Sequence, residues 1–253
     1  MSDSTSFFVV VPFYNEEKGF SATLSALANQ TDPDFSLVLV DNGSTDTSGA
    51  IAAAFAHSST APRVHLVREP QKGTGAASDS GFRFAIRQGA RWIARTDADC
   101  LPRADWVQQL KVAMRDDGLE FVAGVIRPRE DEWPLGRTRR LVLNGMVWVA
   151  EHYGRLRRRG PQFKYPYFMA AGNNLAITPD LYERSGGFPR SAIEDTHEDR
   201  VLSESVRTLT TRAAVRANIV VYNSVRRVRA YGYINTLRWY RNHGYRGAVV
   251  DVR

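Results

Sequence analysis

The sequence has little cysteine, little lysine and no long hydrophobic run. Its 253 residues include a single cysteine, Cys100, which excludes an internal disulfide framework and a metal site built from cysteines. The longest apolar stretch, 141–150, is about half of the ~20 residues that a membrane-spanning helix needs. Residues 1–6 are polar and do not open a signal peptide. We therefore expect a cytoplasmic protein.

Basic residues are concentrated in two blocks. Residues 137–164 hold 8 basic residues and 1 acidic residue, and residues 200–253 hold 11 and 2, whereas the rest of the chain is net acidic. Such blocks suit phosphate groups, anionic lipid or nucleic acid. Only 4 of the 34 basic residues are lysine, so arginine as the ordinary surface cation explains the blocks equally well.

Short apolar runs alternate with segments of helical periodicity in the first half of the chain. The pattern predicts strands at 7–12, 36–40, 64–67, 92–94 and 121–126, and helices at 16–29, 47–56, 75–88 and 104–114. The second half is less regular, with strands predicted at 174–177 and 219–222 and helices at 138–156, from 179, from the acidic cluster 194–199, and at 234–242. Alternation of this kind predicts an α/β fold, with a mostly parallel sheet between two helical layers, in a single domain.

Polar clusters follow four of the predicted strands. They lie at 14–17, 41–46, 71–75 and 97–99. Ligands bind at the carboxyl ends of parallel strands, so we expect these four loops to meet over one edge of the sheet.

The segment Asp97-Ala98-Asp99 directly follows a buried strand. Two carboxylates at this spacing can share Mg²⁺, which often takes one or two protein carboxylates together with substrate phosphates. A solvated turn or a helix N-cap is the competing interpretation.

Two other clusters have chemistry of their own. Asp41 can accept hydrogen bonds from a nucleotide base, and Tyr14 offers a face on which the base can stack. Lys72 and Gly73 precede a helix and form a candidate anion site, although the glycines match neither the dinucleotide fingerprint nor a P-loop. Alternatively, Asp41 forms an Asx turn, the Tyr14 ring is part of the core, and the segment with Lys72 and Gly73 is a flexible loop.

Four carboxylates and a histidine occupy residues 194–199. Like charges this close repel unless a cation, an arginine or a ligand compensates them. The cluster is therefore either an acidic helix start or a general base that faces a substrate.

The order of these motifs resembles the family 2 glycosyltransferases of the GT-A fold, over the chain from Phe7 to about Asn242. The resemblance rests on VVVPFYNEE (9–17), LVDNGSTD (39–46), KGTGAASDSG (72–81), RTDADCLP (95–102), AAGNNLAITPDLYERSGGFP (170–189) and EDRVL (198–202). It implies a GT-A-like domain with a nucleotide-sugar-binding half, 1–117, and an acceptor-binding half, 118–253, that ends in a basic helix.

The resemblance also implies residue roles and an inverting, non-processive reaction. Asp199 would be the catalytic base, assisted by Glu198, and Asp97 and Asp99 would hold Mg²⁺ or Mn²⁺. The donor, a UDP-, GDP- or dTDP-sugar, would contact Pro12, Tyr14, Glu16, Asp41, Lys72, Gly73, Asp97 and Ala98. The acceptor hydroxyl would lie near Gly172, Asn173, Glu198 and Trp239.

The chain departs from the family pattern in three places. Ser78-Asp79 stands where the family often has Arg-Asn, and Asn235 replaces the glutamine of the Q-x-x-R-W motif of polymerising members. Glu194-Asp195 could displace Glu198-Asp199 as the catalytic pair. A sugar-phosphate nucleotidyltransferase, or a non-catalytic module that binds carbohydrate or nucleic acid, remains as an alternative, although we expect no nucleic-acid partner.

The segment 137–164 bears on the acceptor. An apolar stripe there (Leu143, Met146, Val147, Ala150 and Tyr153) lies between two groups of arginines. It could dock on the inner face of an anionic membrane to reach a lipid-linked acceptor, or it could be a helix packed on the core.

Overall fold

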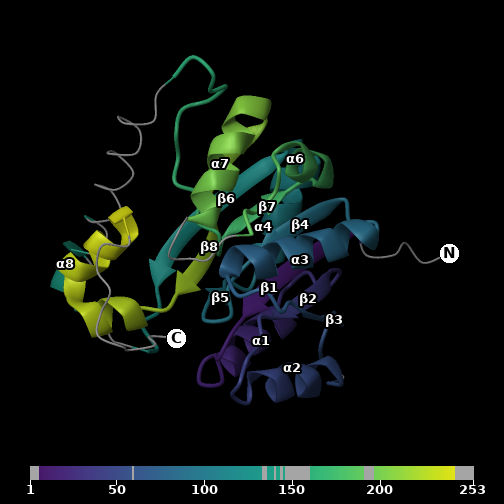
Figure 1. Ribbon diagram of the computed structural model, residues 1–253, viewed down its shortest axis with the longest axis vertical. Helices are drawn as coiled ribbons and strands as arrows, with labels where there is room; N and C mark the ends of the chain where they lie inside the picture. Colours follow the sequence, from purple (N-terminus) through teal and green to yellow (C-terminus); the bar gives the residue numbers. More distant parts are fainter. Residues whose placement is uncertain are drawn as a thin grey trace.

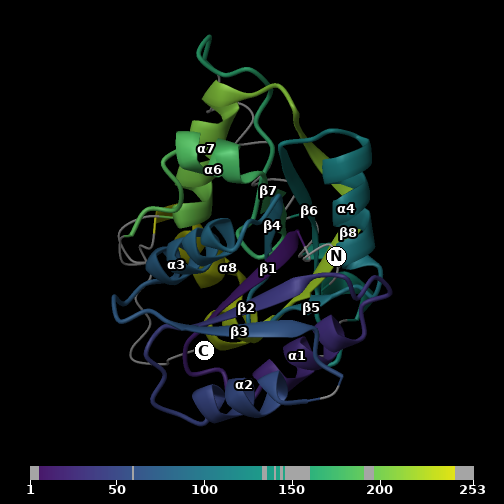
Figure 2. The same cartoon turned by 90° about the vertical axis from the view of Figure 1, so that its right-hand side faces the viewer.

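The computed structural model describes residues 6–58, 60–132, 136–139, 141–142, 145, 160–190 and 197–242. Among them, eight strands form one sheet in the order β3-β2-β1-β4-β7-β6-β8-β5. Helices cover both faces of this sheet, which gives three layers (Figures 1 and 2).

The first half of the chain alternates strands and helices. The elements are β1 (Phe7–Phe13), α1 (Phe20–Ala28), β2 (Ser36–Asp41), α2 (Ser48–Ala56), β3 (Arg63–Arg68), α3 (Thr74–Arg87), β4 (Trp92–Arg95), β5 (Leu101–Pro102), α4 (Trp106–Lys111) with a π-helical continuation (Val112–Asp116), and β6 (Phe121–Pro128).

The second half returns twice to the same sheet. Its elements are β7 (Leu175–Ile177), α6 (Pro179–Arg184), α7 (Glu198–Leu209), β8 (Ala213–Asn223) and α8 (Arg226–Asn242). Strand β7 runs antiparallel between β4 and β6, while β6 and β8 pair in parallel.

Alternate residues of β1 enter different cores, because successive side chains of a strand point to opposite faces. Val9 and Val11 pack with α1, α2 and α4. Phe8 and Val10 pack with α3, α6 and α7. The continuous apolar run at 7–13 is therefore a strand that is buried on both sides.

The pairing register brings the ends of the strands together. Phe13, the last residue of β1, pairs with Asp41 of β2, which in turn pairs with Arg68 of β3. Arg95, the last residue of β4, pairs with Val10 on one side and with Leu175 on the other. The loops after β1, β2, β3 and β4 therefore share one edge of the sheet with the segment that leads into β7.

Helix α3 lies very close to this sheet. A Cβ atom on Gly81 would lie 2.4 Å from a methyl carbon of Val10 and 2.9 Å from one of Val40. A Cβ on Gly75 would lie 2.1 Å from the carbonyl oxygen of Pro189. Both glycines allow neighbouring elements to approach α3 in a way that no other residue permits.

The prediction of an α/β fold with a mostly parallel sheet is confirmed, and the main differences occur late in the chain. Strand β8 is longer than the predicted 219–222, and α8 begins at Arg226 rather than at 234. The short strand β5 was not predicted, because two residues carry no periodicity. The predicted helix 138–156, with its apolar stripe, lies almost entirely outside the described residues.

Helix α8 contains a break at Gly232, where φ is 71° and ψ is 172°. A positive φ of this size is readily adopted by glycine. None of the helices in the described ranges is both long enough and apolar enough to cross a bilayer.

Candidate active site

The loops after β1 and β2 are held together by hydrogen bonds, some between neutral groups and some to the carboxylates of Glu17 and Asp46. Asn15 has a left-handed backbone, with φ of 51°, and its amide N–H donates to Ser44 Oγ at 3.2 Å. The amide N–H of Thr45 donates to Asn15 Oδ1 at 2.8 Å, and that of Glu16 donates to Ser48 Oγ at 2.7 Å. These bonds fix the two loops against each other without any ligand.

Asn42 extends this set of hydrogen bonds to the loop after β3. Its side-chain amide donates to the carbonyl oxygens of Glu69 (3.0 Å) and Gln71 (2.7 Å), and its Oδ1 accepts the N–H of Gly73 at 2.8 Å. Gly73 has φ of 132°, a conformation that L side chains rarely adopt. One buried asparagine therefore sets the path of the chain into α3.

Tyr14, Asp41 and Lys72 come together at this edge. The Lys72 ammonium lies 3.7 Å from the centroid of the Tyr14 ring and donates to the carbonyl oxygen of Gly43 at 3.2 Å. Asp41 Oδ1 accepts the N–H of Ser44, three residues further along the chain, at 2.8 Å. Its other oxygen, Oδ2, accepts no hydrogen bond within the described ranges. Pro12 precedes this group and is buried in β1.

The two aspartates that follow β4 each contact an arginine. Asp97 Oδ1 accepts a hydrogen bond from Arg95 Nε at 3.1 Å, and Asp99 Oδ2 accepts one from Arg226 Nη2 at 3.1 Å. Ala98, between them, is buried, and its carbonyl oxygen accepts the Thr23 hydroxyl at 2.7 Å. Burial raises the pKa of Asp97, and Arg95 opposes that rise.

Glu16 shares Arg226 with Asp99. Its Oε1 lies 2.9 Å from Arg226 Nη2. Burial is the largest influence on Glu16 and, although Arg226 opposes it, the pKa rises to about 7. Burial by itself would lower the pKa of Arg226, but Glu16 and Asp99 together raise it, so the guanidinium stays charged.

Asp97 and Asp99 suit the Mg²⁺ or Mn²⁺ that the resemblance implies. Each has one carboxylate oxygen that accepts no hydrogen bond from nitrogen in the part of the chain that the structure describes. Their side chains remain partly exposed, by 32% and 24%. No group of three or more metal-ligating side chains occurs among the described residues, so such an ion would depend on the phosphates of a substrate for its other ligands.

Asp199 lies in the first turn of α7 and is held by backbone amides. Its Oδ2 accepts the N–H of Gly172 at 3.1 Å, and its Oδ1 accepts the N–H of Arg200 at 2.7 Å. Burial raises its pKa, while these two bonds and the charge of Arg95 pull it down. Glu198 is buried and accepts Arg95 Nη2 at 3.1 Å.

Asn173 lies beside Gly172 at the entrance to β7. Its Nδ2 contacts Cys100 Sγ at 3.4 Å, and its buried Oδ1 has no hydrogen-bond partner among the described residues. Cys100 is fully buried.

The residues from 14 to 99 that were singled out in the sequence therefore share one sheet edge with Gly172, Asn173, Glu198 and Asp199. Glu194 and Asp195 lie outside the described residues. Trp239 belongs to α8, and its side chain also lies outside the described part. Sequence reasoning missed Arg95 and Arg226, since an isolated arginine in an arginine-rich chain carries no signal of its own.

Comparison with known proteins adds the family. The family model "Glycosyl transferase family 2" matches residues 8–193, which is nearly three quarters of the chain and contains all four loops and the aspartates after β4. The chain belongs to glycosyl transferase family 2.

Two curated relatives of this family 2 glycosyltransferase illustrate the match. It is 27% identical over 209 residues to "Glycosyltransferase AglE" of Haloferax volcanii, covering 80% of this chain and 62% of the relative. It is 31% identical over 140 residues to "Polyprenol monophosphomannose synthase" of Mycolicibacterium smegmatis, covering 54% of this chain and 51% of the relative. The chain thus spans less than two thirds of the length of either relative.

A solved structure supports the GT-A architecture. The mannosyltransferase PcManGT of Pyrobaculum calidifontis, in complex with GDP-Man and Mn²⁺, superposes with a TM-score of 0.64 at 24% identity, over 88% of this chain and 58% of that one. Membership of the family displaces the two rival interpretations, a nucleotidyltransferase and a non-catalytic binding module.

The departure of this family 2 glycosyltransferase at Ser78-Asp79 has a structural counterpart. Asp79 is fully buried and accepts hydrogen bonds from Tyr182 (2.9 Å), Arg83 (2.9 Å) and Arg190 (3.1 Å). Arg190 also pairs with Glu69 at 2.7 Å. Asp79 thus fastens the turn after α6 to α3, and it is not available for a phosphate or a sugar.

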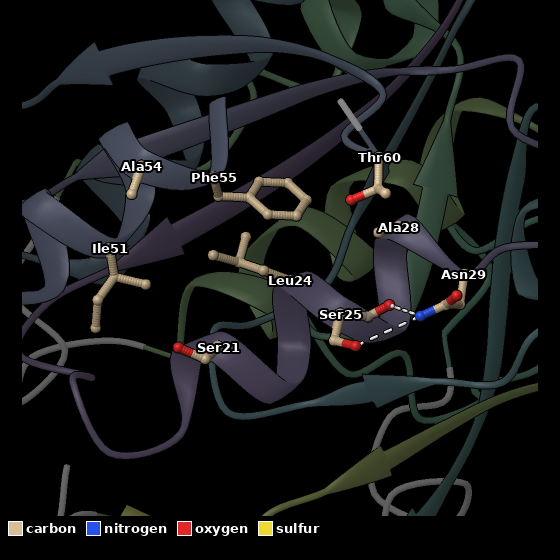
Figure 3. Close-up of a pocket in the computed structure, with 9 residues that line it drawn as sticks. All are labelled: Ser21, Leu24, Ser25, Ala28, Asn29, Ile51, Ala54, Phe55 and Thr60. Carbon is tan, nitrogen blue, oxygen red and sulfur yellow. Dashed lines mark hydrogen bonds between the residues drawn. The ribbon is translucent and has the colours of Figure 1, made fainter. Parts of the chain in front are cut away.

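One surface recess lies elsewhere. It is lined by residues of α1, α2 and the loops after them, including Leu24, Phe55 and Thr60 (Figure 3). None of the residues that line it belongs to the candidate active site.

Proposed function

We propose that the chain transfers a sugar from a nucleotide-diphosphate donor to an acceptor oxygen with inversion at the anomeric carbon, with metal assistance and with Asp199 as general base. The observation that carries this proposal is the meeting of two acidic segments at one buried arginine: Asp97 after β4 and Glu198 at the start of α7 contact the same Arg95.

The donor base is proposed to lie among Tyr14, Asp41 and Lys72. A carboxylate oxygen accepts an N–H, and an ammonium donates to a carbonyl oxygen. Uracil, thymine and guanine present an N–H beside a carbonyl, whereas adenine and cytosine present an exocyclic amine there. This chemistry favours UDP-, dTDP- or GDP-sugars over ADP- and CDP-sugars.

The reaction follows from the charges at the sheet edge. A divalent cation held by Asp97 and Asp99 would act as a Lewis acid for the departing diphosphate. Lys72 and the amino end of α3 add positive potential beside it. An oxocarbenium-like sugar would be attacked from the side opposite to the leaving group.

Asp199 is proposed to take the proton of an acceptor hydroxyl; the oxygen of a phosphate monoester is already anionic near neutral pH and would attack without this step. Burial raises the pKa of Asp199, which strengthens it as a base, while two backbone N–H donors and the charge of Arg95 act against that rise. Glu198 is proposed to assist by holding Arg95. Gly172 and Asn173 adjoin this carboxylate, which supports an acceptor on that side. The halves 1–117 and 118–253 remain a prediction for donor and acceptor binding.

The acceptor is proposed to be lipid-linked. One relative is named as a polyprenol monophosphomannose synthase, and residues 137–164 carry the basic charge that anionic membranes attract. Trp239, on α8, is proposed for the same side of the site. Peripheral binding to the inner face of the membrane, in the cytoplasm, agrees with these features.

A screen of nucleoside diphosphates by thermal shift, with and without Mn²⁺, tests the donor site. We expect stabilisation by one of UDP, dTDP or GDP, dependent on Mn²⁺, and none by ADP or CDP. A ligand at 100 times its Kd raises the free energy of unfolding by ~2.7 kcal/mol. Stabilisation by ADP alone would contradict the base assignment.

Turnover is then measured with the matching nucleotide sugars. The acceptors are a polyprenyl phosphate and an alkyl glycoside, and NMR of the product gives the anomeric configuration. Retention would refute Asp199 as a base in a single displacement. Transfer to the alkyl glycoside but not to the polyprenyl phosphate would refute the lipid-linked acceptor.

A further inference from the structure

Arg95 occupies the centre of the molecule. It ends β4, pairs with Val10 of β1 and Leu175 of β7, and is 1% exposed. The Phe188 ring lies 5.2 Å from its guanidinium carbon. The sheet, the turn after α6 and the start of α7 therefore all surround one charged side chain.

The guanidinium connects two acidic segments that are far apart in sequence. Its Nε donates to Asp97 and its Nη2 to Glu198, each at 3.1 Å. On its remaining side, a Cβ atom on Gly172 would lie 2.8 Å from Nη1 and 3.0 Å from Cζ. The backbone at 172 is thus shaped to the edge of the guanidinium.

Asp199 depends on the same contact. Its Oδ2 accepts the N–H of Gly172, and Gly172 packs directly against Arg95. A displacement of the guanidinium would shift Gly172 and Glu198 together, and both adjoin Asp199. Arg95 itself makes no hydrogen bond to Asp199 in the described part of the chain.

We propose that Arg95 is a positioning residue that holds Asp199 and the start of α7 in register with the aspartates after β4. The proposal rests on the proposed function, because it concerns how the base faces the donor. Nothing in the matched motifs assigns a role to this arginine.

The choice of arginine agrees with a geometric role. A buried ion network is often no more stable than well-packed apolar side chains of similar volume, so stability alone does not call for a charge here. The planar fork of arginine bonds two partners at fixed angles, whereas lysine is a single flexible point charge. Arg95→Lys therefore keeps the charge and removes the geometry.

A matched control lies on α7, the helix that begins with Glu198 and Asp199. Arg207 of α7 is also buried, at 2% exposed, and stacks on Phe163 at 3.9 Å. Its guanidinium donates to the carbonyl oxygen of Tyr165 at 3.2 Å, and no contact with the candidate active site occurs among the residues that the structure describes. Arg207→Lys removes an equally buried fork, so it reports the general loss of stability that any such change brings.

The first experiment compares steady-state kinetics of the full chain with the nucleotide sugar identified by the donor screen. For Arg95→Lys we expect kcat to fall by roughly 100-fold, as for a misplacement of about 1 Å, with the donor KM within about threefold. Arg207→Lys should keep kcat within about threefold of the wild type, even if its Tm falls as far as that of Arg95→Lys. Equal losses of kcat in the two variants would overturn the proposal.

The second experiment combines Arg95→Lys with Asp199→Asn. If Arg95 acts through Asp199, its loss adds little once that carboxylate is gone, whereas independent effects multiply. We expect the double variant to be within about threefold of Asp199→Asn. A further 100-fold loss would overturn the proposal.

Amide hydrogen exchange provides a readout that needs no substrate. Arg95→Lys should speed exchange at the amides of Gly172 and Arg200, which donate to Asp199, and leave the amides of β1 and β2 unchanged; Arg207→Lys should leave all of them protected. Unchanged exchange at Gly172 and Arg200 would overturn the proposal. A wild-type chain that transfers no sugar would defeat the proposed function, and exchange would still decide whether Arg95 positions Asp199.

Discussion

The two sides of the candidate site are built in different ways. On the donor side, neutral hydrogen bonds join loops about 30 residues apart, through Asn15, Asn42 and the hydroxyls of Ser44 and Ser48. At the centre, the contacts are ion pairs between residues more than 100 positions apart, such as Arg95 with Glu198 and Arg226 with Asp99.

This difference has a functional meaning. The hydrogen bonds of Asn15, Asn42, Ser44 and Ser48 fix the conformation of the loop backbone. Less conformational entropy is then lost when a donor binds. The ion pairs instead act against the rise in carboxylate pKa that burial causes, in a partly buried setting where a cation or a substrate can exchange partners with them. Hydrogen bonds thus set the shape of the loops on the donor side, and ion pairs set the charge at Arg95 and Arg226.

The sharpest test of the charged centre is Asp199→Asn. We expect kcat to fall by about 10²- to 10⁴-fold, the usual contribution of a general base, while the affinity for Mn²⁺ and nucleotide stays close to that of the wild type. Single-turnover kinetics and calorimetry measure the two quantities. A loss of nucleotide affinity as large as the loss of kcat would show that Asp199 contributes to donor binding.

Asp99→Ala should separate metal from nucleotide. Without this carboxylate, the part of the nucleotide stabilisation that depends on Mn²⁺ should disappear in the thermal-shift assay, out of a total of ~2.7 kcal/mol at 100 times Kd. The metal-independent part, which comes from the neutral loops, should remain. A variant that still responds fully to Mn²⁺ would show that Asp99 holds no metal.

Asn42→Ala should disturb the neutral side. It leaves the partly buried N–H of Gly73 and two carbonyl oxygens without their partner, which costs about 1–3 kcal/mol of unfolding free energy. Urea denaturation measures this loss. Nucleotide affinity should fall in the same variant because the path into α3 loosens, while Asp97 and Asp99 keep their arginines. Unaltered nucleotide binding would show that this loop does not contact the donor.

The smallest expected effect is that of Arg226→Gln. Loss of the guanidinium leaves Asp99 and Glu16 without their counter-charge, so the affinity for Mn²⁺ alone should rise, by about 1 kcal/mol or roughly fivefold for a partly exposed pair. Arg229→Gln, an exposed position three residues further along α8, is the matched control. Mn²⁺ titration followed by electron paramagnetic resonance measures both, and equal affinities would disconnect Arg226 from the metal site.

The donor side is also the part that the sequence predicts well. Asp41-Asn42-Gly43 follows a short run of leucine and valine, so local turn chemistry and the apolar pattern identify both the strand and its loop. The four polar clusters meet because a parallel sheet aligns the ends of its strands. These inferences need only neighbouring residues and the rules of one fold class.

The charged centre resists prediction for a physical reason. Arg95 and Glu198 meet only because β7 inserts between β4 and β6 and brings Gly172 beside them. No periodicity encodes such a contact, and 34 basic residues offer many candidates. The start of α8 at Arg226 was likewise missed, because the stretch before 234 has few apolar residues with helical spacing.

The isolation of Cys100 has a practical consequence. Its side chain is fully buried, and burial raises the pKa of the thiol well above its ordinary value, so little reactive thiolate forms near neutral pH. A cysteine introduced on the surface, for example on α8 and on α2, would therefore react with a maleimide dye or a spin label far faster than the native one. Distance measurements between labelled helices can start from the natural sequence, with no cysteine removed.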